Sequence, residues 1–337
     1  MKRTWIVLLL AAGGALGGCD ATWNSDQAIE YYVAGTFAME QGKYEAALAE
    51  LIKAVRADPK LSLAYAAMGN IHRKRGDNHQ AANAYELACQ TNPYAFHPHY
   101  NLGVTYQLLA AAAKQARTAA TYVRKAVLVY LRAVTLKPGD FDANLNLSAC
   151  YFQEGKYDMA EQYCKAAINI NTRNPYAFSN LGIIYDAQNR PYDAISAYKN
   201  SLELDVHQPK LLLNLGATYT RLRRPKDAQR AFELATKEDP NFSPGWEQLG
   251  SCHYLQRDWP KALAAYQQAA LLDPGNAAAF RGIGVVYMSQ FLTDRSKTEV
   301  RDSAMDAWHR SLELNSEQPD LLRLVRKYTP KVALPEL

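Results

Sequence analysis

Small residues recur through most of this chain at an interval of 34 residues. After three of them an 11-residue insertion intervenes, and the series then resumes. Its positions are Gly35, Gly69, Gly103, Ser148, Gly182, Gly216, Gly250 and Gly284. An alanine register runs in parallel at Ala47, Ala81, Ala126, Ala160, Ala194, Ala228, Ala262 and Ala304. A fixed period of this length is typical of repeat arrays, in which each repeat buries its core against its neighbours. The sequence therefore predicts one array rather than the two globular domains that 337 residues would otherwise suggest.

Each repeat contains two blocks of apolar residues at helical spacing, separated by a polar break. In residues 175–208 the first block includes Leu181 and Tyr185, and the second includes Ala194 and Tyr198. Steps of three and four residues place each block on one face of a helix. We expect Gly182 and Ala194 to lie where the two antiparallel helices approach most closely. The recurring aromatic residues are interpreted as core.

Glycine and proline mark the ends of the expected helices. Gly42, Gly76 and Gly155 fall at the turn within a repeat, and Pro191, Pro225 and Pro260 open second helices, where the fixed φ of proline is tolerated. Over residues 28–318 the pattern resembles the tetratricopeptide repeat. That resemblance implies an all-α, right-handed superhelical solenoid of about eight helix–turn–helix repeats, with a concave groove lined by the first helices. Residues 319–337 are expected to form a capping helix and tail.

The first residues are typical of an export signal. Lys2 and Arg3 precede a short apolar run that ends in Leu16-Gly17-Gly18-Cys19. Those last four residues resemble the lipobox of bacterial lipoproteins, which implies that residues 1–18 are removed, that Cys19 carries the lipid (palmitate among its acyl chains), and that residues 19–27 form a short tether. The alternative is an ordinary secretory signal with a chance cysteine. Lipidation predicts a periplasm-facing protein anchored to a membrane of the cell envelope.

Composition and motifs favour a binding protein. A net charge of +5 is too mild to indicate nucleic acid, and 48% hydrophobic residues allow a large core. The sequence contains no HExxH, CxxC or phosphate-binding glycine loop. We therefore predict no enzymatic activity, no cofactor, no metal site and no small-molecule substrate. Cys89, Cys150, Cys164 and Cys252 are expected as buried free thiols, and the alternative to check is a Cys150–Cys164 bridge.

Four consecutive repeats carry asparagine two residues before their small residue. These are Asn101, Asn146, Asn180 and Asn214. Asparagine is unfavourable inside a helix, whereas its amide offers both a donor and an acceptor to a peptide backbone. The series resembles the asparagine ladder of O-linked N-acetylglucosamine transferases and importin-type solenoids, which implies an extended peptide partner in the groove. The alternative is that these amides bond to neighbouring helices and only hold the repeat spacing.

Two insertions fall between the paired helices, at residues 107–125 and 288–303. The first is expected to lengthen both helices into a projecting hairpin, which we call the basic projection after Lys114, Arg117, Arg124 and Lys125. No aspartate or glutamate lies between Pro93 and Gly139. The basic projection is predicted to meet anionic lipid or an acidic partner, or else to be a solvated face. In the second insertion, Ser296 and Glu299 predict a capping box.

Together these features predict a lipid-anchored scaffold that binds a protein or peptide in its groove, in pilus or secretion assembly or in envelope assembly. Two other functions remain open at this point. One is a holdase that binds unfolded exported chains with little preference. The other is a homo-oligomeric structural component that associates through its capped ends or its projecting hairpins.

Overall fold

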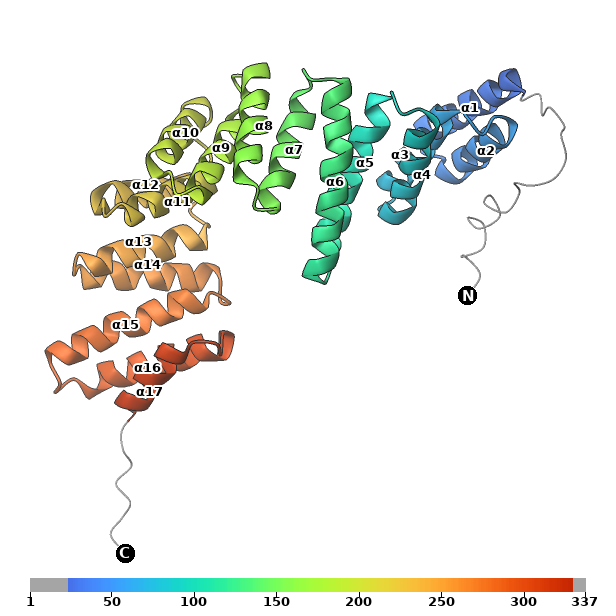
Figure 1. The fold of residues 1–337 in the computed structure, drawn as a ribbon. Helices are drawn as coiled ribbons and strands as arrows, with labels where there is room; N and C mark the ends of the chain where they lie inside the picture. The colour runs from blue at the N-terminus through green and yellow to red at the C-terminus, as the bar shows by residue number, and fades with distance from the viewer. Residues whose placement is uncertain (1–23, 330–337) are drawn as a thin grey trace, which may run out of the picture. The chain divides into compact units, whose positions relative to one another are not determined.

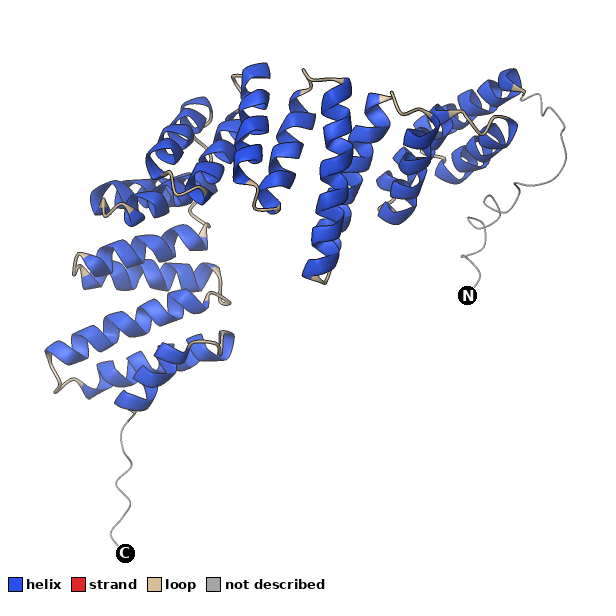
Figure 2. Cartoon of the chain, viewed as in Figure 1, coloured by secondary structure: helices blue, strands red, loops and turns tan. Residues whose placement is uncertain are grey.

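The computed structural model describes residues 24–329, and within this range the chain forms 17 helices and no strand (Figure 2). Successive helices pair through turns of a few residues, and each pair packs on the next within the same unit. The predicted all-α repeat architecture is confirmed. None of the helices described is long and apolar enough to span a bilayer.

The helices group into two compact units, of which the first ends at Pro138 and the second begins at Gly139. Figure 1 labels the helices of both units. The first unit contains α1 (Ser25–Glu40), α2 (Tyr44–Ala57), α3 (Ser62–Lys74), α4 (Asn78–Thr91), α5 (Phe96–Ala112) and α6 (Ala116–Leu136). The second begins with α7 (Phe141–Gln153), α8 (Tyr157–Ile170), α9 (Pro175–Ala187), α10 (Pro191–Leu204), α11 (Pro209–Arg221) and α12 (Pro225–Glu238). It ends with α13 (Ser243–Leu255), α14 (Trp259–Leu272), α15 (Ala277–Thr293), α16 (Thr298–Leu314) and the single helix α17 (Pro319–Tyr328).

In the six pairs without an insertion, the turn between the two helices contains a residue with a left-handed backbone. Gly42, Gly76 and Gly155 adopt φ values of 73°, 78° and 73° at the turn. Glycine reaches this region without the steric cost of a Cβ atom. In three pairs of the second unit, Asn189, Arg223 and Arg257 take the same turn position with φ of 58°, 56° and 61°. The turn is therefore a property of the repeat, and glycine is only its least strained occupant.

The small residues of the first helices make room for an aromatic ring. A Cβ atom added to Gly182 would lie 2.4 Å from Cδ1 of Tyr198 in the second helix of the pair. The same arrangement recurs in the pairs Gly69–Tyr85, Gly103–Tyr130, Gly216–Phe232, Gly250–Tyr266 and Gly284–Trp308. A residue larger than glycine does not fit at Gly182, and the group that excludes it is a side chain of the partner helix.

The repeat with serine at this position replaces the ring as well. The residue of α8 equivalent to Tyr198 is Cys164, which is fully buried. The Ser148 hydroxyl donates a hydrogen bond of 2.7 Å to the Ala160 carbonyl. Since a thiol occupies much less space than a phenol ring, the serine side chain fits.

The two insertions lengthen both helices of their pairs. The helices α5 and α6 contain 17 and 21 residues, and α15 and α16 contain 17 each, against 13 and 14 in an uninterrupted pair such as α9 and α10. The predicted capping box is wrong. The Ser296 hydroxyl donates instead to Asp294 at 2.6 Å, and α16 begins at Thr298 with Lys297 as its N-cap. Because the Asp294 carboxylate also accepts the Ser296 N–H, it holds this serine in the turn before the helix.

Candidate partner-binding site

The asparagine series lies on first helices. Asn101 belongs to α5 of the first unit, and Asn146, Asn180 and Asn214 belong to α7, α9 and α11 of the second. All four are half-buried. In the second unit α7 contacts α9, and α9 contacts α11, so that these three asparagines lie on adjacent helices.

Two of the four amides are available to a partner. The side chains of Asn180 and Asn214 form no hydrogen bond with any residue in the range 24–329, although both are partly accessible. Asn101 differs, since its Nδ2 lies 3.5 Å from Oδ1 of Asn70, which also accepts a hydrogen bond of 2.7 Å from the Tyr85 hydroxyl. The adjacent amides of Asn180 and Asn214 could together donate to and accept from a peptide backbone.

A polar network holds α9 against α11 beside these amides. The Asp186 carboxylate accepts hydrogen bonds from Thr218 at 2.7 Å and from Tyr198 at 2.9 Å, and it pairs with the Arg221 guanidinium. Thr218 and Tyr198 are buried. Burial and the neighbouring carboxylate raise the pKa of Tyr198, so the phenol remains a proton donor to Asp186. The two helices thus hold a fixed spacing without using the asparagines.

The asparagine series does not extend into α13 and α15, where other residues occupy the equivalent positions. In α13 the equivalent residue is Gln248, whose amide donates to Glu247 at 3.0 Å. In α15 it is Gly282, where an added Cβ atom would lie 2.4 Å from Cε1 of Tyr266. Toward the C-terminus, the free amides of the series therefore do not continue beyond α11.

The basic projection presents fewer free charges than its sequence suggests. Lys125 lies 3.9 Å from Glu86 and 5.2 Å above the Tyr106 ring, so it is held against α4 and α5. Lys114, Arg117 and Arg124 are exposed and form no ion pair with residues in the described part of the chain. These three side chains are the available cations.

The end of the basic projection extends past its neighbours within the first unit (Figure 1). His79, the second residue of α4, contacts Tyr122 of α6 with ring centroids 6.3 Å apart. The part of α6 that precedes Tyr122 therefore reaches beyond the start of α4. Arg117 lies in this part of α6, and Lys114 lies in the loop between α5 and α6.

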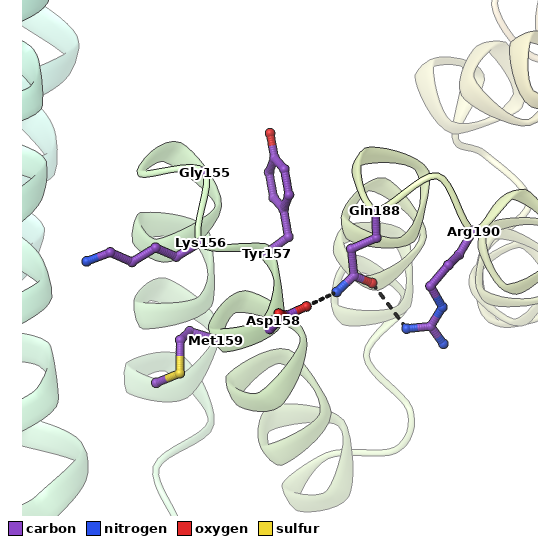
Figure 3. A pocket seen from close by; sticks show the side chains of 7 residues that line it. All are labelled: Gly155, Lys156, Tyr157, Asp158, Met159, Gln188 and Arg190. Atoms are coloured by element: carbon purple, nitrogen blue, oxygen red, sulfur yellow. Dashed lines mark hydrogen bonds between the residues drawn. The ribbon is translucent and has the colours of Figure 1, made fainter.

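The second unit contains a hollow of about 610 Å³ that the sequence did not predict (Figure 3). Its lining comes from the turns before α8 and α10 and comprises Gly155, Lys156, Tyr157, Asp158, Met159, Gln188 and Arg190. Gln188 donates to Asp158 at 2.9 Å and accepts from Arg190 at 3.2 Å, as the dashed lines in Figure 3 show. The two groups of lining residues are about one repeat apart in the sequence, and no local sequence motif therefore indicates the hollow. Since these polar groups already satisfy one another, the hollow is not the site we favour.

The cysteines and histidines give no reactive or metal centre in the range 24–329. All four cysteines there are free thiols, and no disulfide joins Cys150 to Cys164. Three of them are buried as predicted, whereas Cys89 is partly exposed. Burial raises the pKa of the Cys164 thiol to about 12, which keeps it protonated. This range contains no cluster of three or more residues suited to a metal ion. The leader and Cys19 lie outside the described residues.

Sequence models of one repeat family match much of the chain. A model described as TPR repeat matches residues 69–109. Models described as tetratricopeptide repeat match residues 31–61, 107–177, 209–242 and 243–276. No curated protein matches the chain.

Solved structures with the same fold include Cut9–Hcn1 of the APC/C, with 17% identity and a TM-score of 0.55, which covers 84% of this chain and 52% of that one. The chain thus spans about half of that relative. PilF of Pseudomonas aeruginosa matches with 20% identity and a TM-score of 0.51, covering 65% of this chain and 94% of that one. The repeat period, the helix pairs and the matching repeat models together show that the chain belongs to the tetratricopeptide-repeat family.

Proposed function

We propose that this protein is a lipid-anchored scaffold of the bacterial cell envelope that binds a protein segment along α9 and α11. Tetratricopeptide-repeat proteins are generally interaction scaffolds rather than enzymes, and the fold favours a protein or peptide partner. The observation that carries the proposal concerns Asn180 and Asn214, which lie on the contacting helices α9 and α11 and whose amides form no hydrogen bond within residues 24–329. Pilus or secretion assembly is one setting for such a scaffold, and the assembly of other envelope structures is another.

An amide pair of this kind favours an extended backbone over a particular sequence. Each side chain offers one acceptor and two donor hydrogens. A net contribution of about 0.5–1.5 kcal/mol for each hydrogen bond means that two amides position a segment without holding it tightly. Neighbouring groups then supply the rest of the affinity. Tyr176 of α9 is 63% exposed and offers an apolar surface for that purpose.

The anchor in the proposal depends on the lipobox-like residues that end at Cys19. Because α1 begins at Ser25, the predicted tether is shorter than residues 19–27, and after acylation Asp20 to Asn24 would separate the lipid from α1 by at most about 18 Å if fully extended. The scaffold would then work close to the membrane surface and present its partner there.

Photo-crosslinking in intact cells tests the binding surface. A crosslinking residue replaces Ser179, which adjoins Asn180, and in a second strain it replaces Arg117 in the basic projection. A discrete crosslinked protein from position 179 that disappears in the N180A/N214A variant supports the proposal. The N83A/N200A variant is the control, because both of these asparagines are exposed on second helices, and it should retain the product.

Other outcomes of the same experiment replace the proposal. A broad smear from position 179 that survives N180A/N214A favours the holdase function, since unfolded chains would bind in many registers. Capture from position 117 alone makes the basic projection the working surface and leaves the asparagines a structural role.

A further inference from the structure

The helix α1 carries an apolar face that nothing in the described chain covers. Ile29, Val33 and Phe37 follow one another at four-residue steps and are 51%, 57% and 62% exposed. This spacing places them in one stripe along the helix. Contiguous exposed apolar patches on a folded protein commonly mark an interaction surface.

Comparison with the other first helices shows what is missing from α1. Phe37 follows the small residue of its repeat by two positions. The equivalent residues are Ile71, Thr105, Cys150, Ile184, Thr218, Cys252 and Val286, and none is more than 7% exposed. In the first unit, α3 and α5 bury theirs while packing on the second helix of the preceding pair. In the described chain no pair precedes α1, so a side chain of the kind that normally packs there is left at the surface.

The rim of this stripe is acidic. Asp26 and Glu40 lie three residues before and after its ends, and Glu30 lies beside Ile29. All three carboxylates are exposed and pair with no cation in residues 24–329, and α1 contains no lysine or arginine. We call these six residues the α1 face. A surface complementary to the α1 face is apolar with a basic rim. A second α1 face or an anionic bilayer would be repelled, because each carries the same negative charge.

The basic projection of the same unit has that complementary character. Leu108 of α5 is 42% exposed, and Leu128 of α6, which adjoins the basic projection, is 67% exposed. Arg117, Arg124 and Leu128 follow one another at steps of seven and four residues, so they share one face of α6. Lys114, Arg117 and Arg124 form no ion pair with any residue in the range 24–329, and neither α5 nor α6 contains an aspartate or glutamate.

We propose that the α1 face of one copy packs against the basic projection of a second copy. Apolar contact between Phe37 and Leu128 would lie inside a rim of opposite charges. The interaction satisfies both unpartnered surfaces at once, which neither an anionic lipid nor a second α1 face does. This proposal goes beyond the peptide-binding function and shares no residue with it, so either can fail alone.

Charge reversal tests the pairing with the full chain purified in detergent. One variant carries E30K and E40K, and the other carries R117E and R124E. Each variant alone places like charges on both surfaces, and its self-association should weaken at least about tenfold relative to the unaltered chain in sedimentation equilibrium. An equimolar mixture of the two variants should recover association, because the reversed surfaces are again complementary.

The control variant K199E/K226E makes the same change in net charge as R117E/R124E, but at exposed lysines of the second unit, and it should associate like the unaltered chain. The V33D/F37D variant should also weaken association while retaining the unaltered circular dichroism spectrum. A monomeric unaltered chain at all concentrations, or a mixture that stays monomeric, overturns the proposal. Binding of the basic projection to phosphatidylglycerol vesicles without self-association overturns it in favour of a lipid partner.

Discussion

At the scale of single residues, the array depends on matched side chains between the two helices of a pair. Glycine faces a ring in six pairs, and Ser148 faces Cys164 in a seventh. The period in the sequence predicts the small residue and the aromatic stripe separately. It does not predict that they occupy the same space, because this depends on how far the two helices are rotated about their axes. The packing in three dimensions supplies that relation.

A methyl group at Gly182 should destabilise the second unit. The added Cβ atom would meet two ring carbons of Tyr198 at 2.4 Å, and Tyr198 is itself buried and bonded to Asp186. Overpacking typically costs about 1–3 kcal/mol, and the better helix propensity of alanine returns up to about 1 kcal/mol. We expect G182A to lower the free energy of unfolding in urea. A variant as stable as the unaltered chain would mean that the Tyr198 ring moves aside freely.

The serine–cysteine pair gives the converse prediction. In C164Y the new ring would meet the Ser148 side chain, which is already bonded to Ala160. Adding S148G should restore part of the lost stability, although S148G alone removes a hydrogen bond. A double-mutant cycle should give a favourable coupling of about 0.5–3 kcal/mol, measured by urea unfolding. Additive effects of the two changes would contradict the matched-pair explanation.

At the scale of helices, the first unit contains two histidines in sites that disfavour their charge. Burial is the main cause that lowers the pKa of His72 and of His99 below the ordinary histidine value. His72 takes a position where Tyr106, Tyr151, Tyr185 and Tyr219 are found in other first helices. One ring nitrogen of each histidine is buried without a hydrogen bond. A neutral imidazole tolerates this site better than a charged one.

Acid should therefore weaken the first unit. With a lowered pKa in the folded state, the unfolded chain binds more protons as the pH falls below about 6.5, so the stabilisation is present above that value and is lost below it. We expect the thermal midpoint to fall between about pH 7 and about pH 5, and H72Y to reduce the fall. H97Q, at an exposed histidine, serves as the control. An equal pH dependence in H72Y and the unaltered chain would exclude His72 as a contributor.

The helices also show where local sequence rules fail. Ser296 and Glu299 have the spacing of a capping box, yet Asp294 takes the serine hydroxyl and N–H first. From the sequence we expect Lys125 to be a free cation of the basic projection. In the structure it contacts Glu86 and Tyr106, which belong to other helices. In both cases a second interaction partner, which the local sequence rule does not consider, determines where the side chain lies. The prediction of the helix pairs does not fail in this way, because the same pattern recurs in every repeat.

At the scale of the whole molecule, the proposed anchor and the helical array are separate in sequence. Replacing Cys19 in a C19S variant should move the protein from the membrane fraction to the soluble fraction, because it removes the proposed acylation site. The array begins only at α1, so its thermal unfolding should be unchanged. Cell fractionation together with intact-mass measurement checks both statements. Unaltered membrane association in C19S would show that another segment binds the membrane.

The matched side chains within each pair also limit how such an array can change over evolutionary time. Exchanging α7 for another first helix would set a glycine opposite Cys164 and leave a void, and the reverse exchange would force Ser148 against a ring. A duplication or deletion that carries both helices keeps each small residue with its own counterpart. The smallest inheritable module of this protein is therefore the pair, and gain or loss of binding surface is expected to proceed in steps of two helices.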